Sequence, residues 1–351
     1  MKRVLTICLF LFATADVLAQ NPTSPSYDRQ EIRFTSGRFD LVGDLLTPRG
    51  GSPHPVIVYV WGSGPTNRNA HIDRSRILKS FLEKGFAVFL YDKPGSGQSK
   101  GEFDNGRLFE ESAAILIDAI GLLKGHETIN PEAIGLYGSS QASYVMAVAL
   151  RRTSDVAFMI AWSCPMESSI RQSAYLVRNY VLCDGGSREQ AEAAEQAYLR
   201  RGRARAYAEY LAAAEFLERV PAIRDSLGWA GIVPEKYFVP ADTTSESFLD
   251  PSATVASLEI PILALFAEND RQVDPIQGAK VCRRLLSGEK RELSEVAVIP
   301  GADHNMMLSP RGCMQDQKDN YRSVGGATLS PVFLETVAGW LDRLRTHLGR
   351  S

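Results

Sequence analysis

The sequence has no excess of glycine or proline, no internal repeat and no low-complexity tract. Its composition excludes collagenous, disordered and coiled-coil chains and indicates a packed core. It also lacks a dense basic stripe, because 39 lysines and arginines are balanced by 41 acidic residues, for a formal charge of -2. Nucleic acid is therefore not an expected partner. The 351 residues suit one large α/β domain with an insertion, or two coupled domains.

The N-terminal residues have the pattern of a targeting segment. Lys2 and Arg3 are basic, an apolar run covers Val4–Ala13, and Val17–Ala19 give the small-residue pattern of a cleavage site. The apolar run is shorter than the ~20 residues that a membrane-spanning helix needs. We expect residues 1–19 to be a secretory signal peptide cleaved after Ala19, with an uncleaved anchor as the alternative. The mature protein is expected to be secreted or periplasmic, without stable membrane insertion.

Cysteine is scarce. Loss of Cys8 with the signal peptide would leave Cys164, Cys183, Cys282 and Cys313. An even number in an oxidising compartment allows up to two disulfides in any of three pairings, and buried free thiols are the alternative. The spacings do not match paired zinc-ligand motifs.

Short apolar runs alternate with segments of helical periodicity along the rest of the chain. Residues 31–47 have the alternation of an N-terminal antiparallel hairpin. The later apolar runs do not alternate, as expected for strands buried on both faces of a mostly parallel sheet. We therefore predict an α/β fold with helices on both faces of a central sheet. Strands are expected at 56–60, 87–91, 133–137, 156–162, 262–266 and 296–299, and helices at 77–84, 108–124, 141–151, 275–286 and 331–348.

One segment, residues 165–251, interrupts this alternation. It has no convincing strand but several helical patterns, one of which opens with a capping box at Ser187–Gln190. We expect a helical cap inserted over one end of the sheet, between core segments 20–164 and 252–351. Its aromatic residues at near-helical spacing are interpreted as packing contacts, with a ligand box as the alternative. They are Tyr198, Tyr207, Tyr210 and Phe216.

The strongest local motif is Gly138–Ala142, with the pattern G-x-S-x-A between an apolar strand and an apolar helix. This is the context of a nucleophile elbow, in which a strained turn exposes the hydroxyl of Ser140 and small flanking residues leave room for the turn. The following helix directs its N-terminus and the amide of Gln141 at developing negative charge. Ser140 is therefore a candidate nucleophile and Gln141 a candidate oxyanion donor, with a plain serine-containing turn as the alternative.

A serine nucleophile needs a base and an orienting acid, which in this fold class follow it in the order acid, then histidine. Only two histidines follow Ser140. His347 falls in the amphipathic C-terminal segment, where a surface position is expected. His304 follows the last predicted strand, at the strand end where active sites of open α/β sheets lie. His304 is the candidate base, with a structural loop histidine as the alternative.

The candidate acid should lie just after the penultimate predicted strand, where three carboxylates occur. We favour Asp270, with Glu268 and Asp274 as alternatives. Asp274 directly precedes a proline and is expected to cap the helix that begins there. Asp303 is adjacent to His304 and is expected to be a turn residue that cannot reach the ring's Nδ1 atom.

Two glycine-rich loops follow predicted strands. Trp61–Asn69 can point backbone N–H groups at an oxyanion, and it is not a phosphate-binding P-loop because no G-K-[ST] follows. Asp92–Ser99 lacks the third glycine of a dinucleotide fingerprint and is interpreted as a structural loop near the site.

Taken together, these motifs resemble the α/β-hydrolases, and in particular secreted or periplasmic serine esterases with a helical cap. Two residues depart from the family pattern. Trp61 stands where many relatives have histidine, which leaves the detail of the oxyanion loop open, and Ala142 stands where most have glycine. The matching segments span most of the mature chain in the family's order: Gly62–Pro65, Asn67–Asn69, Asp92–Ser99, Ser140, Glu268–Asp270, Val273 and Pro300–His304.

The resemblance implies a nucleophile, Ser140, an acid, Asp270, and a base, His304. It also implies that the amides of Gln141 and Ser63 form the oxyanion hole, without a metal or organic cofactor. The expected reaction is carboxylesterase hydrolysis of a small-molecule ester through an acyl-enzyme. Because every candidate catalytic residue lies outside the cap, the cap is expected to affect selectivity more than assembly of the triad.

The same scaffold hosts other chemistries. A serine peptidase of the aminopeptidase or prolyl-peptidase type is the main alternative, and it would need a carboxylate in the cap to hold a substrate amine. Thioester hydrolysis ranks lower, and a non-catalytic hydrolase-like binding protein is disfavoured because the triad residues are present. The cap carboxylates, which solvated helix positions also explain, are Glu192, Glu195, Glu209 and Glu215.

Overall fold

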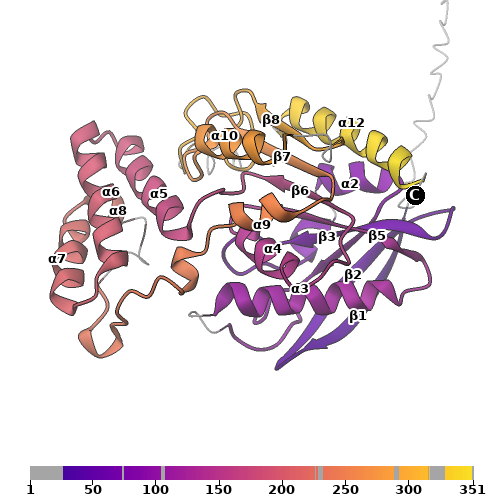
Figure 1. Cartoon of the computed structure of the whole chain (residues 1–351), viewed down its shortest axis with the longest axis horizontal. Helices are drawn as coiled ribbons and strands as arrows, with labels where there is room; N and C mark the ends of the chain where they lie inside the picture. Colours follow the sequence, from indigo (N-terminus) through magenta and orange to yellow (C-terminus); the bar gives the residue numbers. More distant parts are fainter. Residues whose placement is uncertain are drawn as a thin grey trace, which may run out of the picture.

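The chain folds around a mostly parallel sheet (Figure 1). The computed structural model describes residues 27–72, 75–103, 107–225, 227, 232–287, 292–314, 316 and 329–349; the expected signal peptide with its cleavage site and Cys8 lies outside them. The strands are β1 (Tyr27–Ser36), β2 (Phe39–Pro48), β3 (His54–Val60), β4 (Ala87–Tyr91), β5 (Ile129–Ser139), β6 (Phe158–Trp162), β7 (Ile262–Ala267) and β8 (Glu295–Ile299).

The strand order is β1-β2-β4-β3-β5-β6-β7-β8. The first two strands form the predicted antiparallel hairpin, and β2 pairs antiparallel with β4. Every other pairing is parallel, so the carboxyl ends of β3 to β8 lie at one edge of the sheet. Together with the helices on both faces, this is the α/β-hydrolase fold that the sequence predicts.

Helices cover both faces of the sheet (Figure 1). They are α1 (Asn69–Ile72), α2 (Arg76–Glu83), α3 (Leu108–Lys124), α4 (Ala142–Leu150), α9 (Ser252–Ser257), α10 (Pro275–Leu285) and α12 (Pro331–Leu348). The helices α3, α4, α9 and α10 share one hydrophobic core with the sheet, and α2 and α12 share another. No helix in the described ranges is both long enough and apolar enough to cross a membrane.

Strand β3 explains why the core runs show no polar alternation. Its side chains point alternately to the two faces, so Val56 and Val58 join the core under α3 and α4. Ile57 and Tyr59 join the core under α2 and α12. Both faces are covered, so both sets of side chains must be apolar.

Between β6 and β7 the chain leaves the sheet and forms a helical insertion. It comprises α5 (Ser169–Cys183), α6 (Arg188–Arg203), α7 (Tyr207–Glu218), α8 (Pro221–Arg224) and the short 3-10 turns η2 (Glu235–Tyr237) and η3 (Glu246–Phe248). Figure 1 shows α5 to α8 to the left of the sheet. The capping box at the start of α6 is confirmed, with reciprocal bonds between Ser187 and Gln190.

The aromatic residues of the insertion differ in their surroundings. Tyr207 and Tyr210 pack against each other and against Phe238, as the packing interpretation predicts. Tyr198 is half-buried against the core of α5 to α8. Phe216 is 37% exposed and contributes less to packing than its spacing indicates.

The cysteines divide into one disulfide and two free thiols. Cys183 and Cys313 are bonded, with 5.8 Å between their Cα atoms. Cys164 and Cys282 are free and buried, and burial raises the pKa of both thiols, which keeps them protonated. The sequence left disulfides and buried free thiols as alternatives, and the structure contains both: one pair of cysteines is bonded and the other two are free.

Candidate active site

Ser140 lies in the turn between β5 and α4, at the carboxyl edge of the sheet. Its φ of 55° falls in the left-handed region, which a residue with a Cβ atom adopts only under strain. The turn is tight, because a Cβ atom added to Gly138 would lie 2.8 Å from the Cβ of Ala142. Glycine at 138 and a small residue at 142 are thus required, and the turn has the geometry that the elbow motif predicts.

Asp270 and His304 form a direct hydrogen bond between the loops that follow β7 and β8. Nδ1 of His304 donates to Oδ2 of Asp270 over 2.8 Å, and both side chains are buried. The other carboxylate oxygen accepts the amides of Gln272 and Val273, at 2.8 and 2.9 Å. The carboxylate is therefore fixed, and a neutral ring that donates from Nδ1 carries its lone pair on Nε2, as a general base requires.

The other carboxylates near this pair bond to backbone amides instead. Glu268 accepts the amide of Gly301 over 2.8 Å. Asp274 accepts two amides in the first turn of α10, which confirms that it caps this helix. Asp303 accepts two amides within its own turn, also as predicted. Of the three candidate acids, only Asp270 contacts His304.

The environment of His304 shifts its affinity for protons. Burial lowers the pKa of His304, but the charge of Asp270, the hydrogen bond to Asp270 and the charge of Asp303 together raise it above the ordinary value. His347, the other histidine considered, lies exposed on α12.

The sheet topology puts Ser140 at the same edge of the sheet as this pair. Strands β5, β6, β7 and β8 are successive parallel neighbours, so the turns after β5, β7 and β8 emerge at one edge. This is where open α/β sheets hold their ligands. The structure thus joins Asp270 to His304 directly and places Ser140 at the same edge, with β6 between the strand before Ser140 and the strand before Asp270.

The loop after β3 packs on the elbow. A Cβ atom added to Gly62 would lie 3.5 Å from the Cβ of Ser140. Ser63, the implied second oxyanion donor, follows directly in the chain and is exposed. Trp61 is buried, and its Nε1 donates over 2.6 Å to the carbonyl at the end of β4. The indole therefore anchors the start of the loop.

Lys93 binds the same loop from the turn after β4. Its ammonium donates to the carbonyls of Gly62 and Gly64, the latter over 2.9 Å. Burial lowers the pKa of Lys93 to about 8. The sequence interpretation of Asp92–Ser99 as a structural loop near the site agrees with this contact, but it does not single out Lys93, because nothing local to the turn indicates where its side chain points.

A buried network of ion pairs connects the loop after β3 and the turn after β4 to the sheet. Asp92 accepts the backbone amide of Arg68 over 2.7 Å and also accepts its guanidinium. The same guanidinium donates to Asp44 on β2 over 2.5 Å and to Glu31 on β1 over 2.9 Å. Arg68, Asp92 and Asp44 are all buried, so each charge is compensated where water cannot reach it.

Comparison with known proteins agrees with this architecture. The family of X-Pro dipeptidyl-peptidases (S15) matches residues 37–233, more than half of the chain. Esterase EstD of Thermotoga maritima is 26% identical over 296 residues, which cover 82% of this chain. The chain spans only 62% of the length of that esterase.

Two solved structures share the fold. The Pyrococcus furiosus esterase Pf2001 superposes with a TM-score of 0.53 at 13% identity, over 91% of this chain and 93% of that one. An α/β-hydrolase from Penicillium sp. sh18, GrgF, gives 0.51 at 18% identity, over 90% and 98%.

Proposed function

We propose that this chain, which belongs to the X-Pro dipeptidyl-peptidase (S15) family and has the α/β-hydrolase fold, hydrolyses carboxylic esters of small molecules with Ser140 as nucleophile. The observation that carries the proposal is the buried 2.8 Å hydrogen bond between Asp270 and His304, at the sheet edge that also holds the strained turn of Ser140.

The proposed reaction has two halves. Nε2 of His304 takes the Ser140 proton as Oγ attacks the ester carbonyl, and Asp270 stabilises the imidazolium that forms. The amides of Gln141 and Ser63 donate to the carbonyl oxygen while it is negatively charged. The alcohol leaves with the proton from His304, and the acyl group stays on Ser140. Water, deprotonated by His304, then releases the acid.

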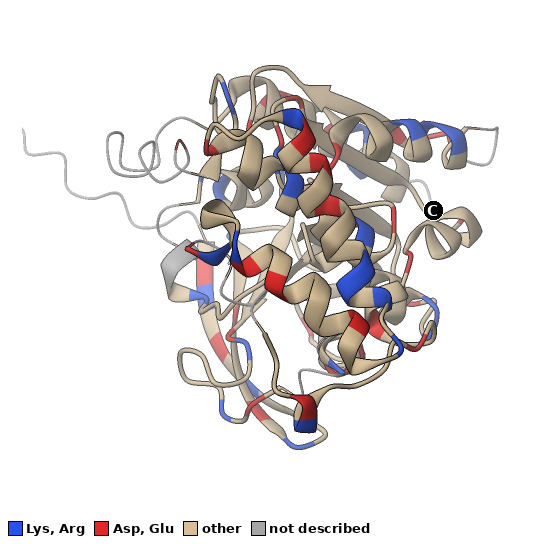
Figure 2. Cartoon of the chain, turned by 90° about the vertical axis from the view of Figure 1, so that its left-hand side faces the viewer, with Lys and Arg blue, Asp and Glu red and all other residues tan. Residues whose placement is uncertain are grey.

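The choice of ester over peptide rests on the relative named as an esterase and on the charges of the insertion. Glu192 and Glu195 form ion pairs with Arg178, at 3.9 and 3.8 Å. Glu215 forms an ion pair with Arg219, at 3.7 Å. Glu209 of α7 accepts the backbone N–H of Arg205, which lies just before that helix. Figure 2, in which the insertion faces the viewer, shows acidic and basic residues interspersed along its helices. These carboxylates already have partners, so a substrate amine would have to displace them.

The family description keeps a peptidase as the second candidate. A panel of esters with graded acyl length, beside aminoacyl and dipeptidyl-prolyl amides, separates the two. We expect turnover of the esters, with Ser140→Ala as the control. Faster turnover of the prolyl amides would establish the peptidase instead. A protein that turns over neither class and does not react with a fluorophosphonate would be a binding protein.

The rate should rise with pH as His304 loses its proton, because only the neutral ring can accept the proton of Ser140. Since the pKa of His304 is raised, the protonated, inactive form persists to higher pH, and the midpoint of kcat/KM should lie above the ~6.5 of an ordinary imidazole. A pH profile on an uncharged ester measures this midpoint. A midpoint well below 6.5 would contradict the assignment.

Replacing Lys93 by methionine should lower kcat about tenfold or more, because the loop that carries the Ser63 amide loses its ammonium anchor. KM should change little, since the oxyanion contact forms mainly in the transition state. Steady-state kinetics on one ester provide the measurement. The control is Lys100→Met, an exposed lysine nearby. Equal rates in the two variants would exclude this role for Lys93.

We also propose that the protein acts outside the cytoplasm, as a secreted or periplasmic enzyme. The pattern of residues 1–19 supports export, and so does the Cys183–Cys313 disulfide, because such bonds persist in oxidising compartments. Mass spectrometry of native material should find an N-terminus near Gln20. A mature chain that still carries Met1 would contradict export with cleavage.

A further inference from the structure

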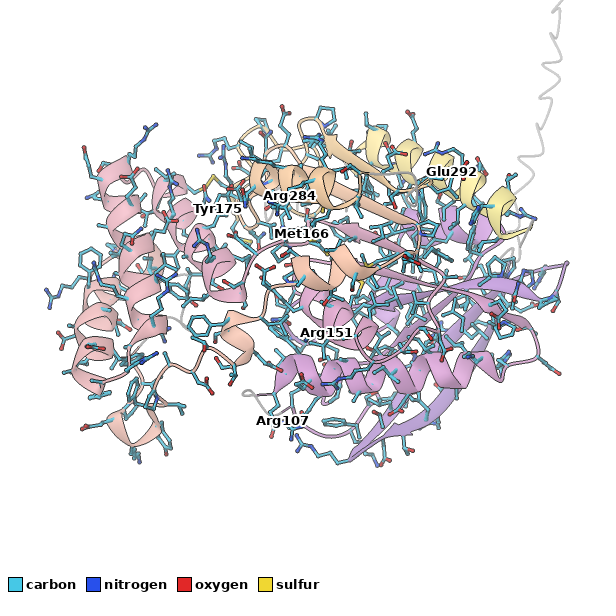
Figure 3. All side chains as sticks on the ribbon, in the orientation of Figure 1. Arg107, Arg151, Met166, Tyr175, Arg284 and Glu292 are labelled. Carbon is cyan, nitrogen blue, oxygen red and sulfur yellow. A yellow bond between two sulfur atoms is a disulfide. The ribbon has the colours of Figure 1, made fainter. Side chains whose placement is uncertain are left out.

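Helix α5 of the insertion is bonded directly to the loop that carries Asp270. The Tyr175 hydroxyl donates to the backbone carbonyl of Asp270 over 3.0 Å. One turn earlier, Nε2 of Gln172 donates to the backbone carbonyl of Gln272 over 2.8 Å. Figure 3 shows Tyr175 between α5 and the part of the core that carries α10. Both bonds therefore join the insertion to the main chain of the acid loop.

Tyr175 remains a proton donor in this setting. Burial and the nearby charges of Asp274 and Asp270 raise its pKa well above the ordinary range. The hydroxyl is thus protonated over the pH range in which His304 titrates, and its bond to the carbonyl is retained across that range.

A second segment, residues 309–313, holds the same loop. Nδ2 of Asn269 donates to the carbonyl of Ser309 over 2.8 Å. Nε of Arg271 donates to the carbonyl of Arg311 over 3.0 Å. At Gly312 a Cβ atom would lie 1.6 Å from the Asn269 carbonyl oxygen, so the two backbones touch. The acid loop therefore has contacts on its main chain from two segments distant in sequence.

The disulfide joins these two segments. Cys183 is the last residue of α5, and Cys313 follows Gly312 directly. The covalent link spans 130 residues and ties α5 to the segment that packs on Asn269. The acid loop thus contacts two elements that the disulfide ties together at the C-terminal end of α5.

We infer that Tyr175 and the Cys183–Cys313 disulfide are positioning elements for the catalytic acid, so that the insertion contributes to the rate as well as to selectivity. This inference rests on the proposed function. It differs from the sequence expectation that the insertion affects selectivity more than triad assembly. The physical reason is that Asp270 orients His304 through one hydrogen bond, and catalytic groups must be held within about 0.5 Å of the productive geometry.

The test compares Tyr175→Phe with Tyr180→Phe, a second tyrosine of α5 that packs in the core of the insertion. Tyr175→Phe should lower kcat about threefold to tenfold, as expected for one hydrogen bond, with KM nearly unchanged. It should also lower the pH midpoint of kcat/KM, because a looser Asp270 raises the pKa of His304 less. Tyr180→Phe should match the wild type in both quantities.

A second variant, Cys183→Ser with Cys313→Ser, tests the covalent part. It should show the same loss of kcat and the same downward shift of the midpoint, and the combination with Tyr175→Phe should be non-additive because both act on one loop. Circular dichroism establishes that each variant is folded. If the double serine variant does not fold, Tyr175→Phe still decides the matter.

The outcomes separate this inference from the proposed function. A wild-type protein that reacts with a fluorophosphonate, beside a Tyr175→Phe variant with wild-type kcat and midpoint, would overturn the inference alone. A loss of stability in Tyr175→Phe without a change in kcat or midpoint would overturn it as well, since that is a structural effect only. A wild-type protein without labelling and without ester turnover would overturn both.

Discussion

Ser140→Ala should reduce turnover of any good ester by roughly 10⁴–10⁶-fold, the scale on which removal of a triad nucleophile acts. The strained turn, the N-terminus of α4 and the loop at Gly62 meet at this one residue. Alanine keeps the Cβ atom that Ser140 already places at positive φ, so the substitution adds no backbone strain. The fold should therefore be retained while the reaction is lost.

The matched control is Ser139→Ala, one residue earlier in β5. Ser139 pairs with Trp162 as part of the sheet, so its side chain is directed differently from that of Ser140. We expect Ser139→Ala to keep most of the activity and to react with a fluorophosphonate, and Ser140→Ala to do neither. Turnover by Ser140→Ala near the wild-type rate would reject the serine-hydrolase mechanism itself.

The sequence predicts the strands and the longer helices of the core well because each of them carries a local signal, whereas the short helices α1 and α9 are not predicted. Helices α3 and α12 begin and end at the predicted residues, and α10 begins at Pro275, where Asp274 caps it. Strand β5 is longer than predicted, because it also includes polar residues on both sides of the apolar run at 133–137. Burial patterns identify the interior of an element, and its ends depend on neighbouring strands.

The candidate site is predictable for a related reason. Ser140, Asp270 and His304 each follow a strand, and parallel strands end at a common edge. The positioning residues lack such a signal. Lys93 and Tyr175 act through backbone carbonyls on other loops, and any residue type supplies a carbonyl.

The disulfide shows the same limit. The four cysteines beyond the expected signal peptide allow three pairings with two bonds, and also the single bond that the described residues contain. The choice of Cys183 and Cys313 follows from the way α5 returns to the acid loop after β6. That path is a property of the whole insertion and is not encoded near either cysteine.

Asp270→Asn should lower kcat on the order of 10⁴-fold, because the amide cannot stabilise the imidazolium and can hold the ring in the wrong tautomer. Glu268→Gln and Asp274→Asn should be much milder. In both, the new side chain keeps an oxygen that can accept the same backbone amides, at the β8 loop and at the start of α10. Each of the three variants removes one negative charge from the loop after β7. A difference in kcat between them therefore reports which contact the lost charge made.

The pH profile adds a second, independent readout to this series. The charge of Asp270 and its hydrogen bond oppose the lowering of the His304 pKa by burial, so Asp270→Asn should move the midpoint of kcat/KM to lower pH. Glu268→Gln and Asp274→Asn should leave the midpoint in place. If either of these two lost turnover and shifted the midpoint while Asp270→Asn kept near-wild-type kinetics, the acid would be misassigned, because the charge that sets the protonation of His304 would then reside on the other carboxylate.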